Sequence, residues 1–139
     1  LVTCTRDTFS EGTAFNITQI TAIAICMADT LRHLHENGVS HGDIYAHNTM
    51  IDEQANMLLG DFGAASDLSS LPKEQQSAMQ AIEVRAFGCL LDDLLPFCRC
   101  STSTEQYKKF LVIKDNCLQA STSKRPSFLE ITEQLSPQA

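Results

Sequence analysis

The stretch from Ala81 to Leu95 constrains the fold most, because its apolar residues surround a helix instead of forming one stripe along it. These apolar positions are Ile82, Val84, Phe87, Leu90, Leu91, Leu94 and Leu95. A helix that is apolar on most sides needs other elements to cover it. We therefore predict that this helix is buried in the centre of the domain and that Pro96 ends it.

Three further helices are predicted from apolar residues that recur every three or four positions. The first runs from Ile17 to Asn37, with Asn16 as its cap and Asn37-Gly38 as its end. Its apolar face is Ile20, Ile23, Ala24, Met27, Leu31 and Leu34. The others run from Tyr107 to Leu118 and, after Pro126, from Ser127 to Leu135. The inward residues of the former are Phe110, Leu111, Ile113, Cys117 and Leu118.

Short apolar runs between the first helix and the central helix predict a small β-ribbon. The runs Thr49–Ile51 and Met57–Leu59 are joined by a turn at Asp52–Asn56, and the piece Val39-Ser40 precedes them. A polar stretch from Ser66 to Ser77 separates the ribbon from the central helix. The predicted fold class is therefore mainly α with a small β-ribbon (α+β).

Composition and charge narrow the function classes. The chain has 139 residues, of which 43% are apolar, and its net charge is −7. One domain is expected. Without a basic stripe, nucleic acid and anionic membranes are unfavourable partners. The longest mostly apolar stretch, Ile20–Ala28, is too short to cross a bilayer, so we expect a soluble protein. The six cysteines show no paired CxxC spacing, which favours thiols in a reducing compartment such as the cytoplasm.

Three polar features lie close together in the sequence: His41-Gly42-Asp43, Asn48 and Asp61-Phe62-Gly63. Phosphoryl transfer from a nucleoside triphosphate needs a carboxylate that positions the attacking hydroxyl and oxygen ligands for magnesium. Asp43, Asn48 and Asp61 supply these groups. Because the ribbon folds back on itself, we expect all three to converge on one site.

These motifs resemble those of protein kinases. The stretch His41–Asn48 is similar to the HRDLKxxN catalytic loop, and Asp61-Phe62-Gly63 to the DFG motif. Glu83–Gly88 resembles the DVWSFG start of the buried central helix, and Lys124–Phe128 the RPSF stretch before the last helix. The four motifs stand in family order. The resemblance implies the carboxy-terminal (large) lobe of the protein kinase superfamily, with residues 17–139 as the lobe and residues 1–16 as a hinge-like segment.

The resemblance also implies roles for single residues, with ATP and Mg²⁺ as cofactors. Asp43 would be the catalytic base, and His41 would pack the catalytic loop onto the DFG turn. Tyr45 replaces the lysine that serine/threonine kinases use against the transferred phosphate, and His47 falls where some tyrosine kinases carry arginine. The acceptor residue therefore stays open. The implied magnesium ligands are Asn48 and Asp61, and the implied adenine contacts are Met50, Cys4 and Arg6.

Several positions depart from the family pattern. Gly42 replaces the arginine of HRD, so control by activation-loop phosphorylation is not expected. The segment after Asp61 is short, and Glu74 is offered as a partner for Arg125. Glu83 replaces an aspartate and can still accept backbone hydrogen bonds from the catalytic loop through a longer arm. His33, His35 and His47 are interpreted as helix-surface or loop residues rather than metal ligands.

The glycine-rich loop and strand lysine of the family belong to a small lobe that would precede Leu1, and neither occurs here. We therefore expect the lobe alone to turn over ATP poorly, and its exposed apolar face could drive dimerisation. The sequence HGDIYAHN followed by LLGDFGAAS is similar to sequences of bacterial kinase-like proteins.

The main hypothesis is ATP-dependent phosphorylation of protein Ser/Thr or Tyr hydroxyls by the full-length protein. One alternative is a pseudokinase that serves as a binding or regulatory module. Another is a small-molecule kinase of the aminoglycoside or choline type, which the HGD variant and the short segment favour. Phe87-Gly88 and Arg125-Pro126 favour the protein-kinase pattern instead.

Overall fold

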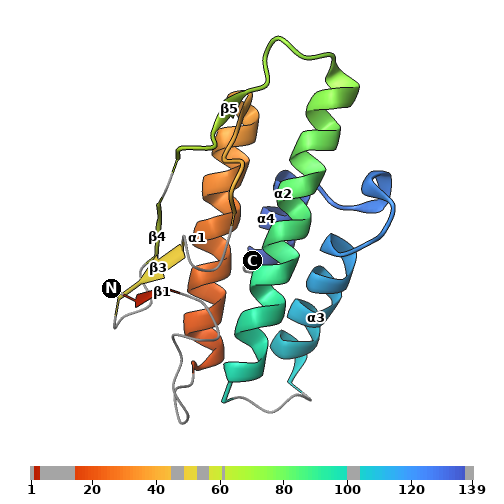
Figure 1. Cartoon of the computed structure of the whole chain (residues 1–139). Coiled ribbons are helices and arrows are strands. Elements are labelled where there is room, and N and C mark those ends of the chain that lie inside the picture. Colours follow the sequence, from red (N-terminus) through yellow and green to blue (C-terminus); the bar gives the residue numbers. More distant parts are fainter. Residues whose placement is uncertain are drawn as a thin grey trace.

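The computed structural model describes residues 2–3, 15–44, 49–52, 57–60, 62–99 and 104–136. Its helices are long and its strands are short, which confirms a mainly α fold with a small β component (Figure 1). The helices are α1 (Ile17–Glu36), α2 (Lys73–Leu94), η3 (Leu95–Phe97), α3 (Glu105–Cys117), η4 (Thr122–Lys124) and α4 (Phe128–Leu135). The strands are β1 (Val2–Thr3), β2 (Val39–Ser40), β3 (Thr49–Ile51), β4 (Met57–Leu59) and β5 (Ser66–Asp67).

Helix α1 begins and ends where its sequence signals predicted. The Asn16 side chain accepts a hydrogen bond from the backbone N–H of Gln19 at 2.8 Å, and the Gln19 side chain accepts from the Asn16 N–H at 2.9 Å. This capping box satisfies two donors that the first turn leaves unpaired. Asn37 caps the other end, and Gly38 follows with a φ of 72°, which glycine adopts at little cost.

Helix α2 is the central helix, but it begins at Lys73 and not at Ala81. The predicted start of this helix at Ala81 was therefore wrong, and the last residues of the polar stretch belong to the helix. Residues 73–75 and 77–79 are exposed, so this part of the helix shows no apolar periodicity, although its Lys, Glu, Gln, Ala and Met residues favour helix. From Ala81 onward the helix is buried on most sides, as predicted, but Ile82 is 57% exposed, so its predicted burial was wrong. Its buried residues are Ala81, Glu83, Val84, Phe87, Gly88, Leu90, Leu91 and Leu94.

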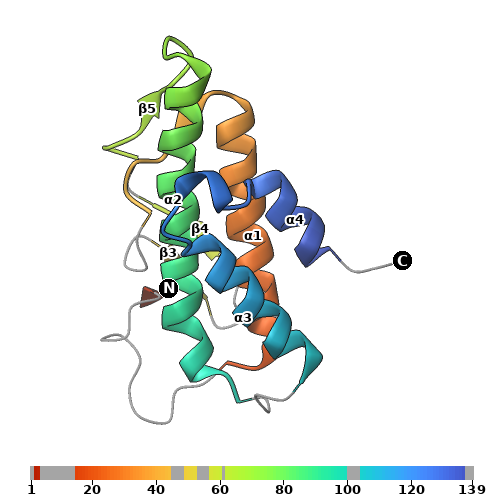
Figure 2. The same ribbon diagram turned by 90° about the vertical axis from the view of Figure 1, so that its right-hand side faces the viewer.

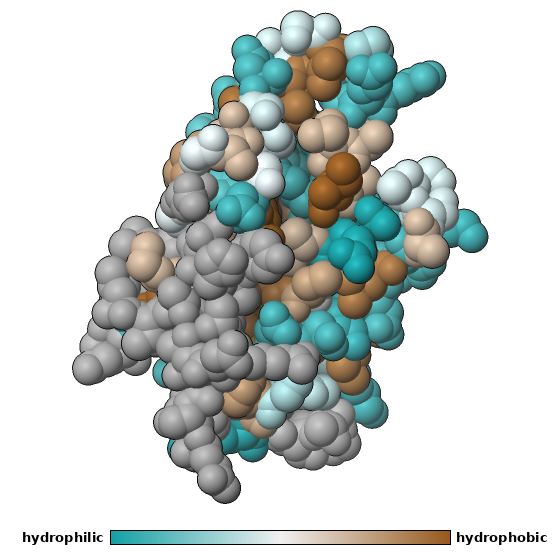
Figure 3. All heavy atoms as spheres, viewed as in Figure 1, coloured by the Kyte–Doolittle hydropathy of each residue, from teal (hydrophilic) through white to brown (hydrophobic). Residues whose placement is uncertain are grey.

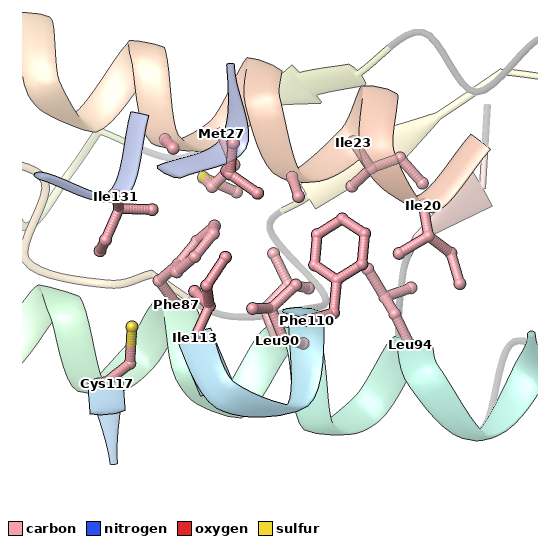
Figure 4. Close-up of a cluster of buried hydrophobic side chains, with 14 of the residues drawn as sticks. Ile20, Ile23, Met27, Phe87, Leu90, Leu94, Phe110, Ile113, Cys117 and Ile131 are labelled. Carbon is pink, nitrogen blue, oxygen red and sulfur yellow. The ribbon is translucent and has the colours of Figure 1, made fainter. Parts of the chain in front are cut away.

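Helix α4 packs against α1 and helix α3 packs against α2, so the four helices enclose one core (Figure 2). Phe87 and Phe110 have no exposed surface, and side chains of all four helices point into the space between them (Figure 4). Burying one such side chain stabilises the fold by about 1.5–3 kcal/mol. Helix α3 approaches α2 closely at Gly88, where an added Cβ would lie 2.9 Å from the Cβ of Cys117.

The strands form two small sheets on one side of the helices. Strands β3 and β4 pair antiparallel, with Met50 opposite Leu58, and β1 adds to the free side of β3, with Thr3 opposite Met50. This confirms the predicted ribbon. Strand β5 was not predicted and pairs with β2, which places Ser66 opposite Ser40. The second sheet thus joins the end of α1 to the chain that leads into α2.

The cysteines of the described part of the chain, namely Cys26, Cys89, Cys98 and Cys117, are free thiols. Burial raises the pKa of the Cys117 thiol to about 12, with the positive charge of Arg125 acting weakly in the opposite direction. Among the described residues, no helix is both long enough and apolar enough to cross a membrane.

Candidate active site

A buried carboxylate on α2 holds the start of the predicted catalytic loop. The Glu83 side chain is 4% exposed. The backbone N–H of His41 donates to its Oε1 at 3.0 Å, and the N–H of Gly42 donates to its Oε2 at 2.9 Å. The prediction that Glu83 accepts backbone hydrogen bonds from this loop is therefore confirmed.

Histidine 35 on α1 contacts the same carboxylate. Its Nε2 lies 2.8 Å from Oε1 of Glu83. Burial by itself would raise the pKa of Glu83, but the hydrogen bonds from His35 and from the backbone of Gly42 and His41 lower it further than burial raises it. The pKa of Glu83 is therefore below its ordinary value. The ionised carboxylate can accept all of these hydrogen bonds at once.

His41 connects the catalytic loop to the chain around the Asp61-Phe62-Gly63 motif. Its side chain is fully buried, and its Nδ1 accepts the N–H of Asp43 at 3.2 Å. The proton is therefore on Nε2, which lies 2.8 Å from the carbonyl oxygen of Gly60. The ring also meets that of Phe62 edge to face, with centroids 4.7 Å apart. His41 thus makes the predicted contact with this motif. It contacts both residues that flank Asp61 in the chain, namely Gly60 and Phe62.

Gly42 lets the two segments approach each other. Its φ is 85°, and a Cβ at this position would lie 2.2 Å from the carbonyl oxygen of Ala64. Only glycine combines this left-handed conformation with so small a volume. The residue that replaces the HRD arginine is therefore a point of close backbone contact, beside the pairing of Ser40 with Ser66.

The structure places some of the predicted site residues and leaves others outside the described ranges. Asp43 is half-buried directly after Gly42, and Met50 is half-buried in the middle of β3. The predicted roles of both stay predictions. The predicted residues that lie outside the described ranges are Cys4, Arg6, Tyr45, His47, Asn48 and Asp61. The described ranges alone contain no cluster of three or more His, Cys, Asp or Glu side chains that could hold a metal.

Two expectations around this site were wrong. His35 is not a surface residue, because its side chain is only 9% exposed and bonded to Glu83. Its position could have been predicted, since it lies four residues after buried Leu31 on the same helix face. The proposed pair of Arg125 with Glu74 is also absent, although both residues are described. Arg125 instead donates through Nε to the carbonyl of Gln119 at 2.8 Å and through Nη1 to that of Ala81 at 2.9 Å.

A buried catalytic-loop histidine and a carboxylate on the central helix match what the protein-kinase resemblance implies. Residues 3–87 also match the family model described as "Protein kinase domain". Because this match covers more than half of the chain, the protein belongs to the protein kinase superfamily.

Relatives from several kingdoms are similar to parts of the chain. The serine/threonine-protein kinase shk1/pak1 of Schizosaccharomyces pombe is 39% identical over 66 residues, or 48% of this chain and 9% of that protein. The CBL-interacting serine/threonine-protein kinase 7 of Arabidopsis thaliana is 40% identical over 53 residues, which are 38% of this chain and 11% of that kinase. The serine/threonine-protein kinase PrkC of Bacillus subtilis is 41% identical over 44 residues, or 32% of this chain and 7% of that kinase. The chain therefore spans only about a tenth of each of these relatives.

Proposed function

We propose that this chain is the carboxy-terminal lobe of a protein kinase and provides the catalytic loop for ATP-dependent phosphorylation of protein hydroxyl groups. The observation that carries the proposal is the position of His41. Its two ring nitrogens bond the backbone of Asp43 and of Gly60, and its ring contacts Phe62. One buried side chain thereby couples the proposed base to both neighbours of the proposed magnesium ligand Asp61.

The proposed division of labour follows from side-chain chemistry. The Asp43 carboxylate orients the acceptor hydroxyl and takes its proton. Asp61 and Asn48 offer carboxylate and amide oxygens, which are donors that suit Mg²⁺. When bound, magnesium supplies positive charge that offsets the charge of the nucleotide phosphates. Tyr45 and His47 lie in the same loop and are proposed to face the transferred phosphate, while Met50, Cys4 and Arg6 are proposed to contact adenine.

The phosphate-clamping groups of the family, a glycine-rich loop and a strand lysine, do not occur in the 139 residues. We therefore propose that transfer takes place when a small lobe is joined to this chain. The serine/threonine-kinase names of the similar proteins support Ser or Thr as the acceptor. Tyr remains an alternative acceptor, because neither Tyr45 nor His47 matches the residue that distinguishes the two kinase classes.

The test is transfer of labelled phosphate to a mixed protein substrate by a polypeptide that carries both lobes. Asp43→Asn and Asp61→Asn keep the side-chain size but remove the charge, and each should lower the rate roughly 10²–10⁴-fold. Asp29→Asn, on the exposed side of α1, is the matched control and should leave the rate unchanged. Normal transfer by the Asp43→Asn variant would refute the assignment.

A binding module and an enzyme differ in a second measurement. The enzyme requires nucleotide binding that strengthens when Mg²⁺ is added, and this strengthening should disappear in Asp61→Asn. Metal-independent binding without any transfer would identify a pseudokinase. Transfer to an aminoglycoside or to choline, but not to protein, would identify a small-molecule kinase.

A further inference from the structure

A cavity of about 510 Å³ opens beside the predicted catalytic loop. Its wall is formed by Ile44, by one side of α2 and by the turn at η4. A second cavity of about 420 Å³ lies between α1, α2 and the start of α4, and none of its lining residues belongs to the catalytic loop. Of these two cavities, the first is lined by Ile44, which directly follows the proposed base Asp43 in the chain.

The floor of this cavity is an apolar strip along α2. Ile82, Ala86 and Cys89 line it and recur every three or four residues, so they share one face of the helix. Ile82 is 57% exposed, so its side chain is accessible from the cavity. The chain from β5 to α2 passes over one end of the helices before it enters α2 (Figure 1). Hydrophobic and hydrophilic surface lie side by side over α2 (Figure 3).

Two guanidinium groups border the same strip. Arg85 is exposed on α2, and Arg125 reaches the cavity from the other side. Arg125 donates hydrogen bonds to two backbone carbonyls, which carry no net charge, and it forms no ion pair within the described residues. The one lining carboxylate, Asp93, lies eight residues beyond Arg85 on α2, about 12 Å along the helix axis. The end of the cavity near Arg85 is therefore positive, although the chain has a net charge of −7.

We propose that this cavity, the α2 groove, docks the acceptor segment of a protein substrate that carries an acidic side chain next to an apolar one. The apolar side chain packs on Ile82 and Ala86, and the acidic one pairs with Arg85 and Arg125. A segment held there passes Ile44 and so approaches Asp43. This inference rests on the proposed function and names its substrate class.

The test is a charge exchange measured by fluorescence anisotropy on the 139-residue chain. The probes are two labelled peptides with the same Leu and Ser residues, one flanked by Glu and the other by Lys. Arg85→Glu should weaken binding of the Glu peptide roughly tenfold, because an exposed ion pair is lost and a repulsion replaces it. The same variant should bind the Lys peptide more tightly than the wild type does. Lys108→Glu, an exposed reversal on α3, is the control for net charge and should change neither affinity by more than about twofold.

The outcomes separate this inference from the proposed function. If both peptides bind the wild type and Arg85→Glu equally, the α2 groove is not the docking site. If the charge exchange is seen but the two-lobe polypeptide transfers no phosphate, docking stands and the proposed function fails. If transfer occurs, Arg85→Glu should raise KM for the Glu peptide roughly tenfold and leave kcat unchanged. Transfer with a KM that Arg85→Glu does not alter would overturn the docking proposal alone.

Discussion

The two halves of α2 contribute different interactions to the fold. From Phe87 to Leu94 the helix contributes apolar side chains that α1, α3 and α4 enclose (Figure 4). Before Phe87, its buried polar side chain is Glu83, which holds the backbone of His41 and Gly42 by hydrogen bonds. Apolar contact is non-directional and proportional to area, whereas a hydrogen bond fixes distance and angle. One helix therefore combines a stabilising half with a positioning half.

The contrast between these two parts of α2 explains how a chain of 139 residues keeps an irregular loop in place. The loop at residues 41–44 offers little apolar surface, apart from Ile44, and it cannot be fixed by burial alone. It is fixed because its N–H groups meet a carboxylate that the rigid core carries. Changes in the second half of α2 should therefore alter stability, and changes around Glu83 should alter loop geometry as well.

The largest effect is expected from Phe87→Ala. Phe87 is fully buried and packs edge to face on Phe128, with centroids 5.6 Å apart. The substitution should lower the free energy of unfolding by about 3–5 kcal/mol, because it leaves a cavity between the helices. Urea denaturation followed by circular dichroism measures the change. Val112→Ala, at a position that is 59% exposed on α3, should cost less than about 0.5 kcal/mol. Equal losses in the two variants would contradict the assignment of the core.

The next effect is expected from Glu83→Ala. It removes the acceptor of three hydrogen bonds and leaves the N–H of His41 buried without a partner, so it should cost about 3 kcal/mol. It should also speed hydrogen exchange at the amides of His41 and Gly42 more than at Leu91. Phe87→Ala instead should speed exchange at all of these amides alike. A uniform increase in Glu83→Ala would mean that Glu83 acts only on global stability.

Local signals explain how much of the fold could be predicted. The bounds of α1 followed from Asn16, Asn37 and its apolar spacing, and the pair of β3 and β4 followed from two apolar runs around a turn. The first turns of α2 and strand β5 were missed. Residues 73–79 lie at the surface and carry no core pattern, and β5 has two exposed residues whose pairing partner lies far away in the sequence. Such elements depend on tertiary contacts more than on their own residues.

The contacts of the candidate site likewise differ in whether they could be predicted from the sequence. The link from Glu83 to the loop could be predicted because its position matches a family motif and it keeps the carboxylate of that motif. The contact of His35 with Glu83 and the approach of Gly42 to Ala64 could not, since each depends on how two distant segments pack. The roles of Asp43, Asn48 and Asp61 stay predictions that the transfer and nucleotide-binding assays test.

A smaller effect is expected from Gly42→Ala, which alters the loop but leaves the Glu83 side chain unchanged. The added methyl group meets the carbonyl of Ala64 and the residue must keep a left-handed φ, so the loss of stability should be roughly 2 kcal/mol. The strain is local, so exchange should speed up at Gly42 and Ala65 but not at Leu91. Gly38→Ala is a matched control, since its φ is also positive but its Cβ would have no contact closer than 3.6 Å. The control should cost about 1 kcal/mol, and an equal cost in both variants would show that the close approach to Ala64 is unimportant.

The smallest effect on stability is expected from lowering the pH. Because the pKa of Glu83 is lower in the folded chain than its ordinary value of 4.5, the unfolded chain takes up this proton first as the pH falls. The contribution of Glu83 to stability is therefore complete above pH 4.5 and is lost as the pH falls through the folded pKa. Between neutral pH and this acidic range, the wild type should lose roughly 1 kcal/mol more stability than Glu83→Gln, the difference between a charge-assisted and a neutral hydrogen bond. Urea titrations at several pH values measure both chains under identical conditions, which cancels the other carboxylates. Parallel pH curves would show that the charge of Glu83 is not what holds the loop, and the positioning role of this half of α2 would then rest on neutral hydrogen bonds.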